Sequence, residues 1–242
     1  MLNVIHFSGG KDSTAMLLMM LEKGISVDYV IFCDTGKEFP QMYGHINKVN
    51  TYIKEKYNKQ ITILKAEKSF DYYMFDHIKT KGKHKGECGY GWTTMRIRWC
   101  TSNMKKNVAN KFLKQIGDCI EYIGIAYDEP KRHKKKADNV IHPLYDWGIT
   151  EAMALDYCYS KGFFWNGLYE HFKRLSCWCC PLKSLPELRT LYKCYPELWE
   201  LLKDMDSRSP NKFKNNCSVQ DLDNRFQLET ATKESMLSLF DN

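Results

Sequence analysis

The stretch that decides the fold is Ser8-Gly9-Gly10-Lys11-Asp12-Ser13, or SGGKDS in one-letter code. An apolar segment, Leu2 to Phe7, precedes it, and apolar residues with helical spacing follow from Asp12 to about Glu22. The two glycines permit a tight turn between a strand and a helix. Backbone N–H groups and the positive end of the helix dipole then point to the same place, so the run predicts an anion-binding turn.

The side chains of this run favour pyrophosphate as the anion. The hydroxyls of Ser8 and Ser13 can donate hydrogen bonds and the Lys11 amine supplies a mobile positive charge, while Asp12 either caps the helix or contacts Mg²⁺ indirectly. The alternative is an ordinary glycine-rich turn capped by Asp12. The spacing is neither that of a Walker A loop nor the dinucleotide-binding GxGxxG, which argues against a kinase or a dehydrogenase. We therefore predict that all six residues bind nucleotide and that Lys11 and Asp12 are also catalytic.

Strands and helices alternate along the first half of the chain. Predicted strands cover residues 2–7, 27–33, 61–66 and 120–126, and predicted helices cover residues 12–22, a segment from Pro40 onward, and residues 103–115. This alternation predicts an α/β fold with a doubly wound, mostly parallel sheet. Further helices are expected over residues 150–161, 168–173, 186–194 and 196–205. We therefore expect a nucleotide-binding α/β domain over residues 1–144 and a helical, cysteine-containing C-terminal region over residues 145–242.

Size and composition are those of a globular protein. The 242 residues are 43% hydrophobic and 14% aromatic, which supplies enough apolar side chains for a sizeable core. No apolar run is long enough to cross a membrane and no export signal is visible at the N-terminus, so we expect a cytoplasmic protein without a membrane partner. The ten cysteines are then expected to be reduced thiols or metal ligands rather than disulfides.

Several motifs together resemble the PP-loop ATP pyrophosphatases and, within them, the phosphoadenosine phosphosulfate (PAPS) reductase family. The resemblance spans residues 4 to about 200, and Ala126 stands where the family usually has an arginine. Besides SGGKDS, the motifs are Asp34 to Pro40 (DTGKEFP), Arg98 to Thr101 (RWCT) with Lys105, Gly124 to Pro130 (GIAYDEP) with Arg132, and Cys177 to Pro181 (CWCCP).

This resemblance implies a Rossmann-like PP-loop fold that binds ATP with Mg²⁺. It assigns nucleotide contacts to Asp34, Thr35 and Gly124, and it gives Arg132 a catalytic role in neutralising phosphate charge. The sequence supports Asp34 independently, because this residue follows an apolar strand at the carboxyl edge, where doubly wound sheets bind their ligands.

The CWCCP run places three thiols within four residues. Cys177 and Cys180 form a CxxC pair that can hold one metal ion, with Cys179 as a substitute ligand. The resemblance places the RWCT segment near the nucleotide, which makes Cys100 the expected third ligand, with Cys88 as the fourth. Thiolate ligands fit a 4Fe–4S cluster or Zn²⁺, and the resemblance favours the cluster. The alternative is a set of buried, reduced thiols.

The net charge of +7 favours a polyanionic partner such as tRNA or DNA. Two lysine-rich, loop-like segments, residues 79–92 and 129–139, are the candidate contacts, and the alternative is that both are solvated loops. A sulfur-donor protein and a second copy of the chain, forming a homodimer, complete the expected partners. The cations concerned are Lys79, Lys81, Lys83, Lys85, Lys131, Arg132, Lys134, Lys135 and Lys136.

The favoured activity is ATP-dependent adenylation of a substrate with pyrophosphate release, followed by sulfur transfer to a nucleic acid or a small molecule. The first alternative is a reductase of PAPS or adenylyl sulfate. Two features argue against it: the SGGKDS loop is unaltered, and the chain lacks the ECGxH segment that reductases share. The second alternative is a noncatalytic nucleotide sensor or nucleic-acid-binding partner.

Overall fold

The chain divides into two compact units. The computed structural model describes residues 1–134, 137–214 and 216–240, with only the backbone of residues 233–240. Unit 1 comprises residues 1–67 and 101–175, and unit 2 comprises residues 68–100 and 176–242. This division differs from the single boundary expected after residue 144, because residues 145–175 belong to unit 1 and the insertion 68–100 belongs to unit 2.

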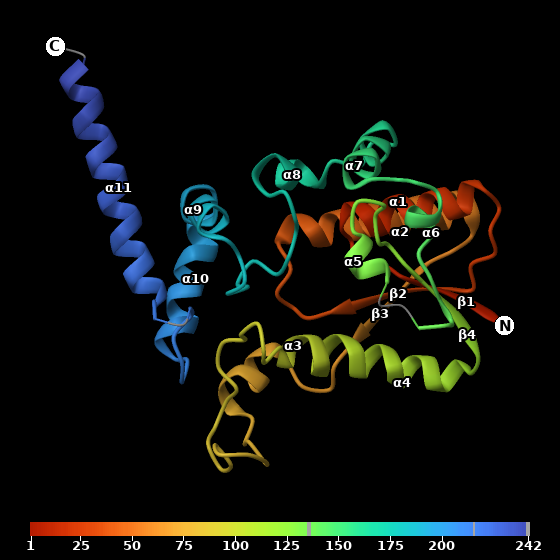
Figure 1. The fold of residues 1–242 in the computed structure, drawn as a ribbon, viewed down its shortest axis with the longest axis horizontal. Coiled ribbons are helices and arrows are strands. Elements are labelled where there is room, and N and C mark those ends of the chain that lie inside the picture. Colours follow the sequence, from red (N-terminus) through yellow and green to blue (C-terminus); the bar gives the residue numbers. More distant parts are fainter. Residues whose placement is uncertain (135–136, 215, 241–242) are drawn as a thin grey trace. The chain divides into compact units, whose positions relative to one another are not determined.

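A five-stranded, all-parallel sheet forms the centre of unit 1 (Figure 1). This sheet confirms the predicted α/β class and the four predicted strands. The strand order is β3-β2-β1-β4-β5, so the chain changes direction across the sheet at β1, where doubly wound sheets bind ligands. The strands are β1 (Leu2–His6), β2 (Tyr29–Asp34), β3 (Ile61–Lys65), β4 (Cys119–Ile123) and β5 (Val140–Ile141).

Helices surround this sheet, and the longer ones occupy the segments in which helices are predicted. The short α5 lies in a segment predicted to be a loop. The helices of unit 1 are α1 (Lys11–Glu22), α2 (Pro40–Tyr57), the π-helix η2 (Ser102–Lys106), α4 (Asn107–Ile116), α5 (Pro130–His133), α6 (Pro143–Asp146), α7 (Glu151–Ser160), the 3₁₀ turn η3 (Trp165–Gly167) and α8 (Leu168–His171). The short α3 (Trp99–Thr101) precedes η2.

Both faces of the sheet are covered. Helices α1 and α2 lie on one face and α4 lies on the other (Figure 1). On the α4 side, Ala109 packs in a buried cluster with Val4 of β1 and Ile31 of β2. Helix α1 is buried around most of its circumference because α7 packs against it. That contact explains why residues 145–175 belong to the nucleotide-binding unit.

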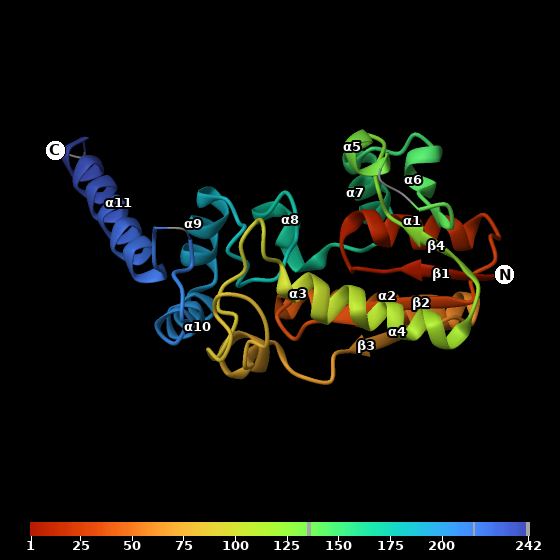
Figure 2. The same cartoon turned by 60° about the horizontal axis from the view of Figure 1, so that its bottom comes forward.

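Unit 2 is mainly helical. Helices α9, α10 and α11 pack on one another (Figures 1 and 2). In their core the Trp199 indole donates to Asp223 at 2.7 Å and its ring contacts the rings of Tyr192 and Phe226. None of the described helices combines the length and apolar character needed to span a membrane. The elements are the π-helix η1 (Tyr72–Asp76), α9 (Leu185–Cys194), α10 (Pro196–Ser207) and α11 (Val219–Phe240).

Candidate nucleotide-binding site

The SGGKDS run forms the turn from β1 into α1. Gly9 has a φ of +79°, in the left-handed region that favours glycine. The Ser13 hydroxyl accepts a hydrogen bond from the Ser8 N–H at 3.1 Å and donates one to the Gly10 carbonyl at 3.0 Å. The hydroxyls of Ser8 and Ser13 also lie 3.0 Å apart. These bonds within the turn hold it at the N-terminus of α1, as the sequence predicts for an anion-binding turn.

Two glycines let neighbouring elements approach this turn closely. A Cβ on Gly124, just after β4, would lie 2.9 Å from both the carbonyl carbon of Asp12 and the nitrogen of Ser13. A Cβ on Gly9 would lie 2.7 Å from the Sδ of Met42 on α2. The contact at Gly124 is with backbone atoms that cannot move aside, so packing requires a glycine there. At Gly9 the contact is with the flexible end of Met42, and it is the φ of +79° that favours glycine.

The buried Lys11 side chain pairs with two partly exposed carboxylates. It is 6% exposed, and its Nζ lies 2.5 Å from a carboxylate oxygen of Glu151 and 3.5 Å from one of Asp12. The Lys11 backbone N–H donates to the Tyr169 hydroxyl at 2.7 Å. A phosphate at the start of α1 therefore competes with Glu151 for the amine and with Tyr169 for this N–H group.

Glu151, Trp165 and Tyr169 are site residues that the sequence analysis missed. They lie on α7, η3 and α8, more than a hundred residues along the chain from the turn. The Trp165 indole donates to the Gly9 carbonyl at 2.7 Å. Burial raises the pKa of the Tyr169 hydroxyl far above its ordinary value, so this hydroxyl is neutral. No local spacing in the sequence connects these side chains to the turn.

Asp12 has the properties of a cation ligand. Its Oδ1 is buried and has no hydrogen-bond partner among the described atoms. Burial raises the Asp12 pKa from 3.8 to about 6 despite the Lys11 charge, and the carboxylates of Glu151 and Glu129 raise it further. Mg²⁺ prefers carboxylate and phosphate oxygens. The buried, unpartnered oxygen of Asp12 is therefore the atom that suits the predicted Mg²⁺, and no group of three or more such side chains among the described residues forms a metal site around it.

Arg132, the third predicted catalytic residue, lies on α5. Its guanidinium donates to both carboxylate oxygens of Glu129, each at 2.7 Å, and its side chain is 47% exposed. Glu129 is one of the carboxylates that raise the Asp12 pKa, so Arg132 is paired to a member of this acidic group. Ala126, where the resemblance leads us to expect an arginine, is fully buried.

Asp34 and Thr35 lie at the carboxyl end of β2. The Asp34 Oδ1 accepts hydrogen bonds from the Tyr43 hydroxyl and from the Gly36 N–H, both at 2.8 Å. The Lys65 amine lies 3.5 Å from Oδ2, and Thr35 is buried. Asp34 is therefore a fixed carboxylate at the ligand-binding edge of the sheet.

A cavity of about 390 Å³ lies beside the turn within unit 1. Apolar side chains of β1, β2 and β4 line it together with Ala109 of α4, and Lys105 adds a positive charge. The His6 Nε2 lies 2.7 Å from a Glu121 carboxylate oxygen in the same lining. The volume of this cavity is in the range of pockets that bind small molecules. Because Ser8 also lines it, one ligand can reach from this cavity to the start of α1.

The lysines predicted to contact a polyanion lie in both units. In unit 2, the Lys79 amine pairs with Glu87 at 3.1 Å, and Lys81, Lys83 and Lys85 are exposed. In unit 1, Lys131 and Lys134 are exposed on either side of Arg132. Lys135 and Lys136 lie outside the described residues.

The predicted metal-binding cysteines all belong to unit 2. The CWCCP run turns sharply, with the Cys180 N–H donating to the Cys177 carbonyl at 3.1 Å. Cys179 is buried, Cys177, Cys180 and Cys100 are partly exposed, and Cys88 is exposed. Burial raises the pKa of the Cys180 thiol, and the nearby Cys100 thiol raises it further. Cys100 therefore lies near Cys180 of the CWCCP run, and its role as a metal ligand stays a prediction.

Lys183 is a buried amine close to these thiols. Burial lowers its pKa, and the charges of Glu187 and of the three CWCC thiols oppose that shift. Within residues 1–134, 137–214 and 216–232, no three or more Cys, His, Asp or Glu side chains are arranged as a metal site. The donor types fit a thiolate-bound metal but their described arrangement does not, so the 4Fe–4S cluster and the alternative Zn²⁺ remain predictions.

Together, the parallel sheet, the anion-binding turn after β1 and the adjoining cavity define a nucleotide-binding α/β protein of the PP-loop type. A family model described as the phosphoadenosine phosphosulfate reductase domain matches residues 3–183. The chain belongs to this family, which confirms the resemblance seen in its motifs.

The curated relatives are longer than this chain. It is 28% identical over 214 residues to the uncharacterized protein MJ0066 of Methanocaldococcus jannaschii, covering 81% of this chain and 40% of that protein. MJ0973 of the same organism is 28% identical over 213 residues, covering 84% of this chain and 47% of that protein. The chain thus spans less than half the length of either relative.

A phage protein and a solved structure are also similar. The uncharacterized nin region protein ORF290 of Escherichia phage lambda is 28% identical over 155 residues, covering 56% of this chain and 52% of that protein. The crystal structure of PAPS reductase from Candida auris, a phosphate complex, gives a TM-score of 0.49 at 20% identity, covering 74% of this chain and 82% of that one.

Proposed function

We propose that the protein binds ATP with Mg²⁺ at the SGGKDS turn, adenylates an acceptor with release of pyrophosphate, and thereby prepares the acceptor for sulfur transfer. The observation that carries the proposal is the buried Lys11 amine at the start of α1, with Asp12 and Glu151 beside it. One cation and several carboxylates around an anion-binding turn suit a metal-bound polyphosphate. Family membership supports nucleotide binding at this site.

In this proposal the turn holds the β- and γ-phosphates. The first N–H groups of α1 and the Ser8 and Ser13 hydroxyls donate hydrogen bonds to phosphate oxygens. Lys11 exchanges its ion pair with Glu151 for one with the pyrophosphate group. Asp12, whose buried oxygen has no described partner, holds Mg²⁺, which supplies charge neutralisation when bound.

The chemistry is a displacement at the α-phosphorus. An acceptor oxygen forms a bond to this phosphorus while the bond to the pyrophosphate oxygen breaks. Lys11 and the N–H groups stabilise the charge that develops on the departing pyrophosphate. A sulfide-class nucleophile then attacks the activated centre, and AMP leaves with the acceptor oxygen. Where the nucleophile is instead the outer sulfur of a cysteine persulfide, the same displacement gives a disulfide-linked product. A second thiol of the protein then cleaves this disulfide, which releases the thiolated acceptor and leaves a disulfide between the two cysteines. The thiols of Cys177, Cys179 and Cys180 are the proposed site of that sulfur: one thiol carries it as a persulfide, received from a persulfide-class donor, and a second thiol cleaves the resulting disulfide.

A second candidate, favoured by the family match itself, is reduction of PAPS or adenylyl sulfate. In that reaction a pair of thiols reduces the sulfuryl group to sulfite, the adenosine phosphate leaves, and the thiols become a disulfide. No pyrophosphate is formed. The two candidates therefore differ in their products, even though both use the same nucleotide site.

A direct test combines ATP, Mg²⁺ and bulk tRNA or DNA and measures pyrophosphate. We expect release by the parent protein, and we expect Lys11→Ala to weaken ATP binding by about 10- to 100-fold with little loss of stability, because a charge-assisted hydrogen bond is removed. Lys54→Ala, which replaces an exposed lysine of α2, is the matched control and should bind ATP normally.

Three other outcomes would count against the proposal. Unchanged ATP affinity in Lys11→Ala removes the phosphate role of the turn. Sulfite from PAPS and a dithiol, without pyrophosphate from ATP, establishes the reductase. ATP binding without any product favours a nucleotide sensor.

A further inference from the structure

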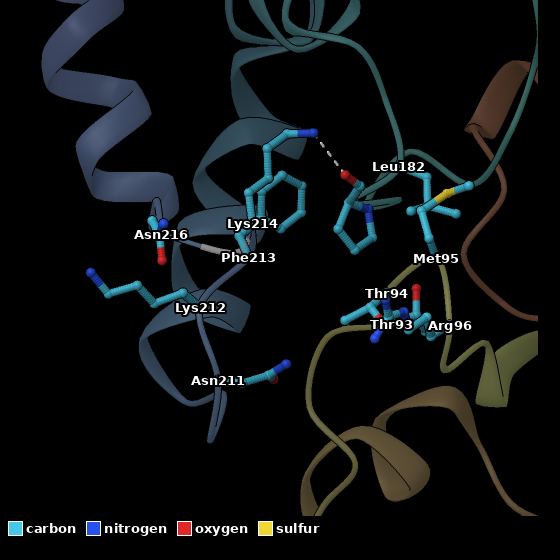
Figure 3. A pocket seen from close by; sticks show the side chains of 11 residues that line it. Thr93, Thr94, Met95, Arg96, Leu182, Asn211, Lys212, Phe213, Lys214 and Asn216 are labelled. Atoms are coloured by element: carbon cyan, nitrogen blue, oxygen red, sulfur yellow. Dashed lines mark hydrogen bonds between the residues drawn. The ribbon is translucent and has the colours of Figure 1, made fainter.

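A cavity of about 940 Å³ lies within unit 2, and the function proposed above assigns nothing to it. Three chain segments line it (Figure 3): residues 93–96 of the insertion, residues 211–214 with Asn216, and Pro181 with Leu182. Pockets that bury a drug-sized ligand measure about 300–1,000 Å³. The cavity therefore has room for a ligand larger than one phosphate group.

The charged side chains lining this cavity are all cations. They are Arg96, Lys212 and Lys214, and no aspartate or glutamate is among the described lining residues. The Lys214 amine donates to the Pro181 carbonyl at 2.8 Å (Figure 3). It also donates to the Lys183 carbonyl at 2.7 Å, and the two bonds fix its position. Arg96 and Lys212 are exposed, and neither forms an ion pair with another described side chain. Two cations are thus available to an anionic ligand.

The uncharged lining suits a ligand with both polar and flat apolar parts. Thr93 and Thr94 supply hydroxyls near Arg96, while Met95, 79% exposed, and Leu182 supply apolar surface. A strand of nucleic acid offers this combination, because its phosphates repeat along one edge and its unpaired bases are flat and apolar on their faces. A free phosphate or sulfate ion would leave the apolar lining unused.

The lining also adjoins the cysteine run. Pro181 follows Cys180 directly in the chain, and the charge of Lys214 interacts with the Cys180 thiol. A ligand that contacts Pro181 and Lys214 would therefore lie close to the thiols to which we assigned sulfur chemistry.

We propose that this cavity binds a single-stranded segment of nucleic acid, with Arg96 and Lys212 as its phosphate contacts, and presents it to the Cys177–Cys180 run. The role of the strand as sulfur acceptor rests on the proposed function. Binding itself requires no ATP and can be measured separately.

The test is the fluorescence anisotropy of a labelled twelve-nucleotide single strand, as DNA and as RNA, titrated with the full chain without ATP at several KCl concentrations. Arg96→Gln with Lys212→Gln should raise Kd about tenfold and reduce the slope of log Kd against log salt by about 1.4, since each contact to a single-stranded phosphate contributes about 0.7. Lys68→Gln with Lys193→Gln removes the same charge from exposed positions of unit 2 outside the cavity, and it should change Kd by less than about twofold.

The proposal is overturned if the cavity variant binds the strand like the parent, or if the control variant loses as much affinity. It is also overturned if AMP or inorganic phosphate competes as well as the unlabelled strand, because the cavity is then a small-anion site. The melting temperature and ATP affinity of both variants should match those of the parent, which excludes misfolding. If the parent protein binds the strand through this cavity but releases no pyrophosphate from ATP, only the proposed adenylation chemistry is refuted.

Discussion

At the scale of single residues, the charges around the start of α1 determine what the turn can bind. Lys11 is buried and lies within ion-pair distance of the carboxylates of Asp12 and Glu151, which are partly exposed. Burial of a carboxylate favours its neutral form, which is why the Asp12 pKa is raised to about 6. The site therefore holds an ionised Asp12 at neutral pH at a cost in folding stability.

This cost predicts that Asp12→Asn stabilises the protein above pH 6. Since the folded pKa of about 6 lies above the ordinary 3.8, the protonated carboxyl favours folding at low pH, and this contribution is lost as the pH rises through 6. Asp12→Asn should raise the free energy of unfolding at pH 8 by up to about 3 kcal/mol and by nearly nothing at pH 4. Urea denaturation of the parent and the variant, without nucleotide and at both pH values, measures this difference in the free energy of unfolding.

Asp156→Asn is the control, because Asp156 is exposed on α7 and its replacement should change stability little at either pH. An equal gain from Asp12→Asn at pH 4 and pH 8 would mean that the carboxylate is not destabilised by burial. Asp12→Asn should also lose Mg²⁺-dependent ATP binding, because a residue needed for function can lower the stability of the protein that carries it.

The residues of the turn could be predicted because their signal is local. Six consecutive residues with two glycines imply the strand-to-helix turn, and the φ of Gly9 agrees with that interpretation. Glu151 and Tyr169 could not be predicted, because they reach Lys11 from 140 and 158 residues away. Such partners are selected by the packing of α7 and α8, and no periodicity in the sequence reports that packing.

At the scale of elements, the site depends on how closely β4 approaches the start of α1. Gly124→Ala should distort the turn, because the new Cβ would lie 2.9 Å from backbone atoms that cannot rotate away. We expect ATP affinity to fall by about tenfold or more and stability to fall by about 1–3 kcal/mol. Isothermal titration with ATP and Mg²⁺, together with thermal melting, measures both effects.

Gly44→Ala is the matched control for this prediction. Gly44 lies within α2, and a Cβ there would meet nothing within 4 Å. Because alanine favours a helix over glycine, Gly44→Ala should raise stability by about 0.5–1 kcal/mol and leave ATP affinity unchanged. Normal ATP binding by Gly124→Ala would show that the close approach of β4 is dispensable.

Some of the helices and strands could be predicted from the sequence and others could not. Strands β1 to β4 could be predicted because buried parallel strands read as apolar runs, as in Val30 to Phe32. Strand β5 has two residues and α5 has four, both too short for a periodic pattern. Helix α11 was not predicted, because charged and polar residues dominate its first half and its buried apolar residues there are only Val219, Leu222 and Phe226.

At the scale of the whole molecule, the two candidate sites belong to different units. The SGGKDS turn lies in unit 1 and the CWCCP cysteines lie in unit 2. The insertion belongs to unit 2 because Trp92 is held there: its backbone N–H donates to Asn211 at 2.6 Å and its indole donates to Asp206 at 2.7 Å. These pairs are more than a hundred residues apart in sequence, so a change of composition near residue 145 could not reveal them.

The division predicts that nucleotide binding and thiol chemistry can be removed separately. If the parent binds the predicted metal, Cys177→Ser should abolish it and any absorbance near about 400 nm from an iron–sulfur cluster, because it removes one thiolate of the CxxC pair. The same variant should bind ATP like the parent, since every described side chain of the turn belongs to unit 1. Lys11→Ala should show the reverse pattern. Iron, acid-labile sulfide and zinc, quantified after anaerobic purification, are compared with ATP affinity in both variants.

Cys194→Ser is the control, because Cys194 is an exposed thiol of unit 2 at the end of α9, outside the CWCCP run. It should retain both metal and ATP binding. If the parent contains no metal, the cysteines act as reduced thiols, and Cys177→Ser should then lower sulfur transfer without lowering pyrophosphate release. A Cys177→Ser variant that loses ATP binding while remaining folded would contradict the separation, because it would make the thiols part of the nucleotide site itself.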